Sequence, residues 1–237
     1  MNIEKFDIII RKQFKKHKLN LSEKEVDLFY EYMNNLLEWN SKINLTAIKK
    51  EEEIIVKHFL DSSIMVNYIK KGTVLDIGSG AGFPGIPIKI MNDDINVKLI
   101  DSVGKKIRFL DDTIIKLKLK GINAEHVRAE ELAYKNSDRE NYDFVVSRAV
   151  ANMSTLVEYM LPFVKVGGKC ICMKGPSIEE ELKEAEKAIK ILGGEVVDII
   201  KYNVEENERT LVIISKKRVT EQTYPRKLGK PLKEPLR

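Results

Sequence analysis

The stretch TVLDIGSGAGFPGIPIKIM, Thr73 to Met91, places four glycines within eight residues, between two apolar runs. Glycine has no Cβ and readily adopts positive φ, so such a loop lets a ligand approach the backbone closely. A loop of the Walker phosphate-binding type ends in Gly-Lys-Ser/Thr. Here Gly85 is followed by Ile86 and Pro87. The loop is therefore not of the Walker type, and the sequence around it indicates which other ligand it binds.

Strand-like and helical patterns alternate from Gly72 onward. VKLID precedes KKIRFLDDTIIKLKL, for example, and KCICMK precedes IEEELKEAEKAIKIL. Alternation of this kind predicts a parallel sheet covered by helices on both faces. The last two strand-like runs, EVVDIIKYN and RTLVIISKK, are separated only by VEENE, which is too short for a crossover helix. We therefore predict an α/β, Rossmann-like fold whose mostly parallel sheet ends in an antiparallel hairpin.

The first 70 residues show no strand pattern and are expected to form a helical extension. Ser22-Glu-Lys-Glu25 has the spacing of a capping box, and an apolar stripe at helical spacing continues from it to about Trp39. A second amphipathic helix is expected over Glu51 to Ile69. The predicted organisation has three parts: residues 1–70 as a helical region packed on the core, residues 71–217 as the Rossmann-like domain, and residues 218–237 as a basic C-terminal tail. The Pro- and Lys-rich end of this tail, YPRKLGKPLKEPLR, is expected to be extended.

Composition limits the class of protein. Of the 237 residues 43% are hydrophobic and 32% charged, and none of the apolar runs reaches the ~18 residues of a membrane-spanning helix. Cys170 and Cys172 are two apart in a strand-like run, and the histidines His17, His58 and His126 are scattered. Neither a disulfide nor a metal-ligand cluster is predicted from such spacing. We expect a cytoplasmic, metal-free monomer that does not associate with membranes.

Both chain ends are basic. The first twenty residues hold six Lys or Arg against two acidic residues, and Lys216 to Arg237 holds eight against two. Clustered positive charge is expected of a protein with a polyanionic partner such as RNA. A solubilising tail has the same composition. Both interpretations stay open at this point.

Two kinds of cofactor fit a glycine-rich loop that follows a strand. The dinucleotide fingerprint G-x-G-x-x-G is formally present from Gly80 to Gly85. Asp101 follows about 20 residues on, where a carboxylate binds ribose hydroxyls. However, Asp76 ends the first strand, where its charge opposes a pyrophosphate and favours a cationic ligand. S-adenosylmethionine carries an ammonium, a sulfonium and an adenosine but no phosphate, so it suits the sequence better.

The segments VLDIGSGAGFPGIPI and LIDSVGKKIRFL resemble the class I methyltransferase motifs, specifically those of the glucose-inhibited division protein B family. Further segments match in order: WNSKINLTAI, KHFLDS, RAEEL, SRAVANM, GGKCICMKG, RTLVIISK and YPRKLGKPLKEPL. The resemblance covers nearly everything from Trp39 to the C-terminus. It implies an S-adenosylmethionine-dependent methyltransferase that acts on guanine N7 of 16S ribosomal RNA, with that RNA or the small ribosomal subunit as its partner.

The resemblance also implies the cofactor contacts. Gly78, Gly80 and Phe83 lie at the cofactor loop, Asp101 binds the ribose, Ala129 and Glu130 border the adenine, and Arg148 lines the pocket. Two of these residues have a structural alternative. Phe83 could be a core residue, and Glu130 could be a helix-start carboxylate that interacts with the helix dipole.

Methylation at guanine N7 needs no general base, because N7 carries a lone pair and no proton; the enzyme must mainly align the reactants. The segment Ser147-Arg148-Ala149-Val150 lacks the Asp/Asn-Pro-Pro-aromatic sequence of enzymes that methylate exocyclic amines. The two cysteines lie in a strand, not on a loop that presents a nucleophile. Arg148 or Lys174 is expected to hydrogen-bond guanine O6. Arg148 is preferred because its fork is rigid and always charged.

Substrate capture is assigned to the basic tail, where Arg226, Lys227 and Lys230 are expected to contact RNA phosphates. Two other functions remain compatible with the sequence: a nicotinamide-dependent oxidoreductase, and a non-catalytic RNA-binding or assembly module. Cofactor binding separates the first of these from the methyltransferase, and methyl turnover separates the second.

Overall fold

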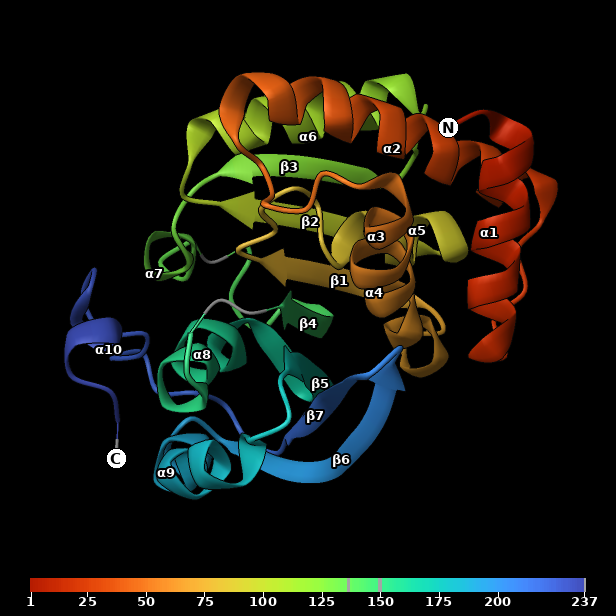
Figure 1. The fold of residues 1–237 in the computed structure, drawn as a ribbon. Coiled ribbons are helices and arrows are strands. Elements are labelled where there is room, and N and C mark those ends of the chain that lie inside the picture. The colour runs from red at the N-terminus through yellow and green to blue at the C-terminus, as the bar shows by residue number, and fades with distance from the viewer. Residues whose placement is uncertain (136, 149–150, 237) are drawn as a thin grey trace.

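A seven-stranded sheet forms the centre of the computed structural model, which describes residues 1–135, 137–148 and 151–236 (Figure 1). The strand order is β3-β2-β1-β4-β5-β7-β6, with β7 antiparallel to both neighbours and the other pairs parallel. The strands are β1 (Gly72–Ile77), β2 (Ile95–Asp101), β3 (Ile122–His126), β4 (Tyr142–Arg148), β5 (Val164–Lys174), β6 (Gly194–Val204) and β7 (Asn207–Lys216). The predicted parallel sheet with a terminal antiparallel hairpin is confirmed.

The strand order reverses between β1 and β4. The chain runs outward from β1 to β2 and β3, then returns to the other side of β1 with β4 and β5. In open α/β sheets, ligands bind at such a reversal, beyond the carboxyl ends of the strands. The glycine-rich loop that follows β1 lies at this point.

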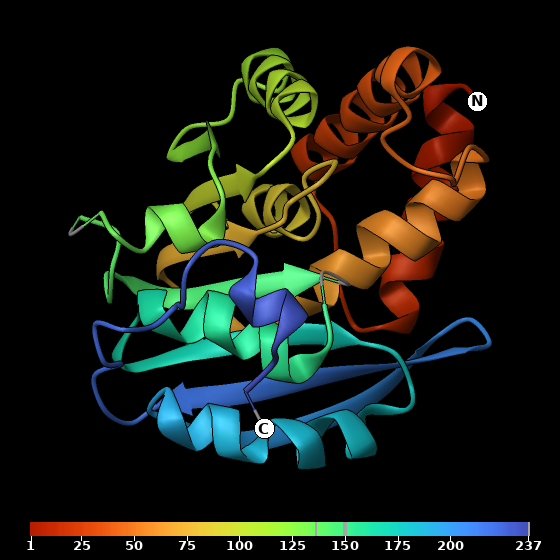
Figure 2. The ribbon, with the colours of Figure 1, turned by 90° about the vertical axis from the view of Figure 1, so that its left-hand side faces the viewer.

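Helices cover both faces of the sheet and bury two hydrophobic cores (Figure 2). The helices of one face include α1 (Ile3–Lys16), α2 (Glu23–Ile43), α5 (Gly85–Met91) and α6 (Gly104–Lys116); those of the other include α7 (Ala129–Leu132), α8 (Met153–Met160) and α9 (Ile178–Ile191). Side chains alternate along β5, so Cys170 and Cys172 face one core and Ile171 faces the other. Both cysteines are buried and free.

The helical extension forms as predicted, with two differences. The capping box of Ser22 and Glu25 starts α2, but this helix ends at Ile43, not near Trp39. Asn44 terminates it with a positive φ of 48°, a conformation that asparagine tolerates. The second helical segment runs from Glu51 to Tyr68 and contains a π-helical stretch, Ile55–Leu60, in its middle.

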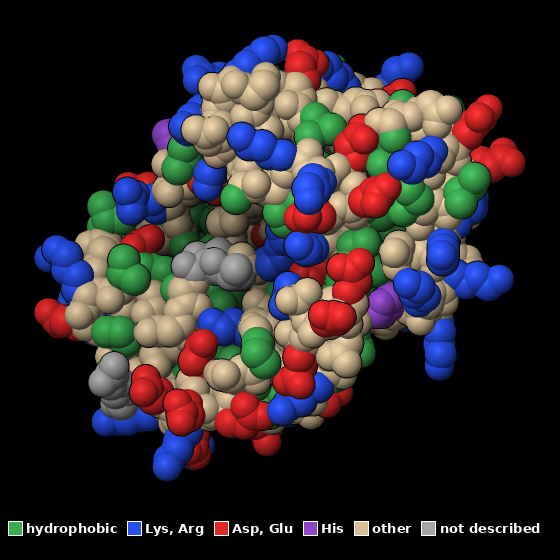
Figure 3. All heavy atoms as spheres, in the orientation of Figure 1, with side chains coloured by type: hydrophobic (Ala, Val, Ile, Leu, Met, Phe, Trp, Pro, Cys, Tyr) green, Lys and Arg blue, Asp and Glu red, His purple; other side chains and the backbone are tan. Residues whose placement is uncertain are grey.

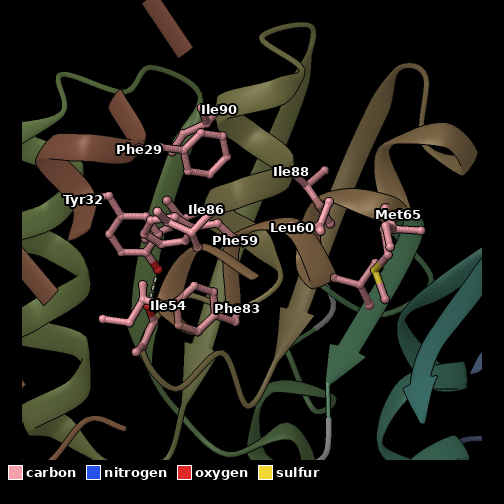
Figure 4. Packing of buried hydrophobic residues seen from close by; sticks show 14 of the residues in the cluster. Phe29, Tyr32, Ile54, Phe59, Leu60, Met65, Phe83, Ile86, Ile88 and Ile90 are labelled. Carbon is pink, nitrogen blue, oxygen red and sulfur yellow. Dashed lines mark hydrogen bonds between the residues drawn. The ribbon is translucent and has the colours of Figure 1, made fainter. Parts of the chain in front are cut away.

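Tyr32 on α2 connects the helical extension to the glycine-rich loop. Its ring is fully buried and lies 5.1 Å from the ring of Phe59 and 5.6 Å from that of Phe83, between centroids (Figure 4). Its hydroxyl donates a hydrogen bond to the carbonyl of Ala81, inside the loop. The extension therefore braces the loop from behind.

Replacing Tyr32 by phenylalanine should lower the free energy of unfolding by ~1–3 kcal/mol, because the carbonyl of Ala81 loses its buried donor. Urea denaturation would measure the change. Tyr30→Phe is the matched control, since the Tyr30 hydroxyl donates to the carbonyl of Met1 at a half-buried site. Equal effects of the two changes would contradict the bracing role of Tyr32.

The C-terminal tail is not extended as expected but folds back onto the domain. It contains a short helix, α10 (Lys230–Lys233), and the guanidinium of Arg139 donates to the carbonyls of Thr220, Glu221 and Tyr224 at 2.7–2.9 Å. A composition rich in proline and lysine does not reveal a docking partner about 80 residues away in the chain, which explains the wrong prediction.

Within the described ranges, no helix is both long and apolar enough to cross a membrane. The same described ranges contain no cluster of three or more His, Cys, Asp or Glu side chains that could hold a metal ion.

Candidate active site

A hollow of about 350 Å³ lies at the strand reversal, beyond the carboxyl ends of β1, β2 and β4. This volume falls within the ~300–1,000 Å³ that is usual for small-molecule sites. Figure 3 shows this face hollowed between the helical extension and α8, with Lys and Arg side chains at its border. Of the residues predicted to bind a cofactor, five line the hollow: Gly78, Asp101, Ala129, Glu130 and Arg148.

The glycines of the loop have different tasks. A Cβ at Gly82 would lie 2.7 Å from the Tyr32 hydroxyl, and one at Gly85 would lie 2.3 Å from a methyl group of Leu99. These two glycines are needed for packing. A Cβ at Gly80 would meet its nearest neighbour only at 3.9 Å, so the backbone there faces open space. Such an exposed stretch of loop suits a ligand held close to the main chain.

Asp76 lies beneath the loop and has no exposed surface. Its Oδ2 accepts the N–H of Gly85 at 2.9 Å, while its Oδ1 has no hydrogen-bond partner among the described residues. Burial raises the pKa of this carboxyl to about 7. Asp76 is not among the residues that line the hollow, so the structure gives it the role of holding the glycine-rich loop through Gly85.

Asp101 ends β2 and holds the loop to the next segment. One carboxylate oxygen accepts the N–H of Gly80 at 3.0 Å, and the other accepts the N–H of Val103 at 2.9 Å. The ammonium of Lys106 lies 3.3 Å from the first oxygen. Two carboxylate oxygens offer about four acceptor positions. Three of these positions are used by Gly80, Val103 and Lys106, so Asp101 keeps about one for a ribose hydroxyl, the contact that was predicted for it.

Glu130 combines the two roles considered for it. It lies in the first turn of α7, and it is also buried in the wall of the hollow beside Ala129. The N–H of Gly229 donates to its Oε1 at 3.1 Å. Tyr159 of α8 also lines this end of the hollow, where burial and the charge of Glu130 raise the pKa of its hydroxyl to about 12.

Arg148 ends β4 and is held from several sides. Its Nη1 donates to the carbonyl of Lys57 at 3.1 Å, and its Nη2 donates to Nδ1 of His58 at 2.9 Å. The guanidinium carbon lies 4.7 Å from the ring centroid of Phe83. Phe83 itself is buried in the core beneath Arg148 and is not among the residues that line the hollow. The structure thus favours the alternative in which Phe83 is a core residue.

His58 is neutral and orients Arg148. Arginine can only donate, so Nδ1 of His58 must accept and the ring proton sits on Nε2, 2.8 Å from the hydroxyl of Thr46. Burial and the charge of Arg148 lower the pKa of His58 to about 3. The arginine is therefore fixed by an acceptor that does not become charged at neutral pH.

A second hollow, of about 450 Å³, shares Arg148 with the first. Sequence reasoning missed three of its lining residues: His58, Asp61 and Arg209. The signal was available, since His58 and Asp61 belong to the KHFLDS segment and Arg209 to RTLVIISK. Lys174 also lines this hollow, but its ammonium is paired with Glu181 at 2.7 Å. Arg148 is therefore better placed than Lys174 to contact ligands in both hollows.

Asp61 supplies a carboxylate to the wall of the second hollow. Its Oδ1 accepts a hydrogen bond from the Tyr202 hydroxyl at 3.0 Å, and its Oδ2 lies 3.9 Å from Nη1 of Arg148 and 3.5 Å from Nε of Arg209. Burial raises the pKa of this carboxyl, and the two arginines oppose that rise. The second hollow thus has both donors and an acceptor in its wall.

The three tail residues predicted to bind RNA are placed differently. Arg226 forms a bidentate ion pair with Glu158, a buried carboxylate of α8. Lys227 is exposed, and the ammonium of Lys230 is half exposed, 3.7 Å from Glu234. Contact with RNA phosphates stays a prediction for the two lysines, whereas the guanidinium of Arg226 already pairs with a carboxylate of the same chain. Ala149 and Val150, which follow Arg148, lie outside the described residues.

Comparison with known proteins identifies close relatives. The family model for rRNA small subunit methyltransferase G matches residues 25–212. A ribosomal RNA small subunit methyltransferase G from Alkaliphilus oremlandii is 47% identical, over 92% of this chain and 94% of its own. The protein of the same name from Desulforamulus reducens is also 47% identical, over 97% of this chain and 98% of its own.

Solved structures share the fold at low sequence identity. The crystal structure of M. jannaschii TYW2 in complex with AdoMet has a TM-score of 0.53 at 15% identity, covering 67% of this chain and 76% of its own. A SAM-dependent methyltransferase from Aquifex aeolicus has a TM-score of 0.53 at 17% identity, covering 72% of this chain and 96% of its own. These likenesses confirm the predicted class I methyltransferase fold.

Proposed function

Because the chain belongs to the rRNA small subunit methyltransferase G family, we propose that it transfers the methyl group of S-adenosylmethionine to guanine N7 in 16S ribosomal RNA. Family membership supports the reaction and the substrate class. The observation that carries the proposal at the level of the site is that Arg148 lines two adjoining hollows. The first suits the cofactor, and the second suits a base held next to it.

S-adenosylmethionine supplies an electrophilic methyl group that the lone pair of guanine N7 attacks directly, with the sulfur as the leaving atom. The protein contributes alignment and charge placement. Arg148 has five N–H groups, and three have hydrogen-bond partners among the described residues. The other two are available to donate to guanine O6, beside N7 on the same edge of the base.

Charge placement follows from the walls of the hollows. Guanine gains positive charge as N7 becomes methylated, so a nearby carboxylate is favourable. Asp61 is in the wall of the second hollow and within 3.9 Å of Arg148. It offsets the charge of the arginine beside the base. His58 stays neutral and adds no opposing charge.

Capture of the RNA is assigned to the exposed lysines of the tail. Changing both Lys227 and Lys230 to alanine should weaken RNA binding and reduce the slope of log K against log salt by about 2, since each phosphate contact contributes about 1. Binding titrations at several salt concentrations would measure this slope. Lys187→Ala, an exposed lysine on α9, is the control. An unchanged slope in the double variant would show that the two lysines do not contact phosphates.

The proposed reaction is tested by incubating the full chain with S-adenosylmethionine labelled in the methyl group and small ribosomal subunits that lack the modification. Naked 16S ribosomal RNA and transfer RNA are run beside them. The proposal expects label in the small-subunit RNA and none in transfer RNA. A protein that binds the cofactor but labels none of these RNAs would contradict the proposed function and favour a non-catalytic role.

A further inference from the structure

The C-terminal tail contacts the wall of the cofactor hollow. The N–H of Gly229 donates to Glu130, which lines the hollow, and the carbonyl of Pro231 accepts a hydrogen bond from the hydroxyl of Thr155 on α8 at 3.1 Å. Figure 2 shows α10 lying against α8. The tail is therefore part of the structure behind one end of the hollow, which is the end assigned to adenine.

Arg226 anchors this part of the tail. Its Nε and Nη2 donate to the two carboxylate oxygens of Glu158 at 2.9 and 2.7 Å, and its own backbone N–H donates to Oε1 at 2.8 Å. Glu158 has no exposed surface. Bidentate arginine–carboxylate pairs fix geometry as well as charge. A buried partner makes this pair far less dispensable than a surface ion pair.

The anchor and the hollow are connected through α8. Tyr159 follows Glu158 in sequence and lines the hollow together with Glu130. The tail therefore contacts the wall of the hollow at two places: Arg226 pairs with Glu158 beside Tyr159, and three residues further on the N–H of Gly229 donates to Glu130. Glu130 is thus held by a backbone donor whose position depends on the docked tail.

We propose that Arg226 is a positioning residue for the cofactor: by docking the tail, it holds Glu130 oriented to accept the exocyclic N6 amine of adenine. This inference rests on the proposed function, which puts adenosine in this hollow. Gly229 uses one acceptor position of the Glu130 carboxylate. About four such positions exist. The remaining acceptor positions can bind the N–H groups of the adenine amine. An apolar pocket has no hydrogen-bond acceptor and would not recognise this amine.

The test compares two ligands that differ at this amine. S-adenosylhomocysteine carries the N6 amine, and S-inosylhomocysteine carries a carbonyl oxygen in its place. Calorimetric titration of the full wild-type chain should show a clear preference for the adenosyl compound. In Arg226→Ala, we expect affinity for the adenosyl compound to fall about tenfold, as for loss of a hydrogen bond to a charged group. Affinity for the inosyl compound should change little, so the preference shrinks.

Steady-state kinetics of methyl transfer provide a second test, whose expected result a general loss of structure would not produce. Arg226→Ala should raise KM for S-adenosylmethionine while kcat at saturating cofactor stays within about twofold. The lost interaction stabilises the bound cofactor equally in the ground state and in the transition state, so its loss changes KM and not kcat. Arg226→Lys should restore part of the preference, since lysine keeps one charged donor. Lys217→Ala removes an exposed ion pair with Glu195 in the same part of the chain and should leave both ligands unaffected.

Glu158→Gln removes the same anchor from the other side and serves if Arg226→Ala does not fold. Folded variants that keep the wild-type preference would overturn the inference, as would variants that lose affinity for both ligands equally. If wild-type protein binds neither ligand and transfers no methyl group, the proposed function itself fails. If it transfers methyl groups normally and only the variants fail to show the change, the function stands and the positioning role does not.

Discussion

Arg148→Ala is expected to lower kcat for methyl transfer to small-subunit RNA by ~100-fold or more, the effect typical of removing one pre-oriented donor at a reacting group. The reason is geometric. Arg148 is the residue that both hollows share, and its guanidinium donates to Lys57, Ser62 and His58, which leaves two N–H groups without a partner among the described residues. Without it, guanine has no fixed orientation toward the methyl group.

The measurement is a single-turnover methylation assay with saturating cofactor, accompanied by a cofactor titration of each variant. Arg108→Ala provides the matched control, since Arg108 is an exposed arginine on α6. Circular dichroism and a melting curve show whether the variant folds, because removal of Arg148 leaves Asp61 with one fewer cation nearby. A folded Arg148→Ala protein with wild-type turnover would contradict the assignment of Arg148 to the substrate.

Asp101→Ala should raise the dissociation constant of S-adenosylmethionine by ~100-fold. A hydrogen bond to a charged group contributes about 1.5–3 kcal/mol, and a ribose hydroxyl is expected to bind this carboxylate. The change also leaves the N–H groups of Gly80 and Val103 without their acceptor, so the loop loses its fixed shape. Calorimetric titration would measure the loss.

Two comparisons make the Asp101 experiment specific. Asp101→Asn keeps the size of the side chain and one carbonyl acceptor, so it should lose less affinity than Asp101→Ala. Asp111→Ala changes an exposed aspartate on α6 and should bind cofactor as the wild type does. If Asp101→Ala binds S-adenosylmethionine with unchanged affinity, the cofactor does not lie in the hollow between β1 and β2.

The sheet and the cofactor loop could be predicted from sequence because their signals are local. Alternating strand and helix patterns define the parallel sheet, and the short VEENE connection defines the hairpin. The loop glycines and Asp101 lie within 24 residues, on two adjacent strands. Parallel strands bring such residues to one edge of the sheet whatever the rest of the chain does.

The parts that sequence did not predict depend on contacts between distant segments. Arg148 meets His58 across 90 positions, and Arg226 meets Glu158 across 68. A basic residue in a proline-rich tail looks the same in sequence whether it faces RNA or a buried carboxylate. Only packing decides between the two, and here it gave Arg226 an internal partner.

Phe83 illustrates the same limit within a motif. Its position in the glycine-rich loop indicated a cofactor contact, yet Tyr32 and Phe59, from outside the loop, draw its ring into the core. The ring still lies beneath the guanidinium of Arg148. The ring is thus a core residue that supports the arginine, and a cofactor contact through the Phe83 backbone stays a prediction.

Identification of the methylated nucleoside tests the central claim most directly. Small ribosomal subunits that lack the modification are incubated with the protein and labelled S-adenosylmethionine, and the RNA is digested to nucleosides and separated by chromatography. Our account predicts that the label elutes as 7-methylguanosine and is lost with Arg148→Ala. Label in any other nucleoside would contradict the assignment of guanine N7 as the nucleophile.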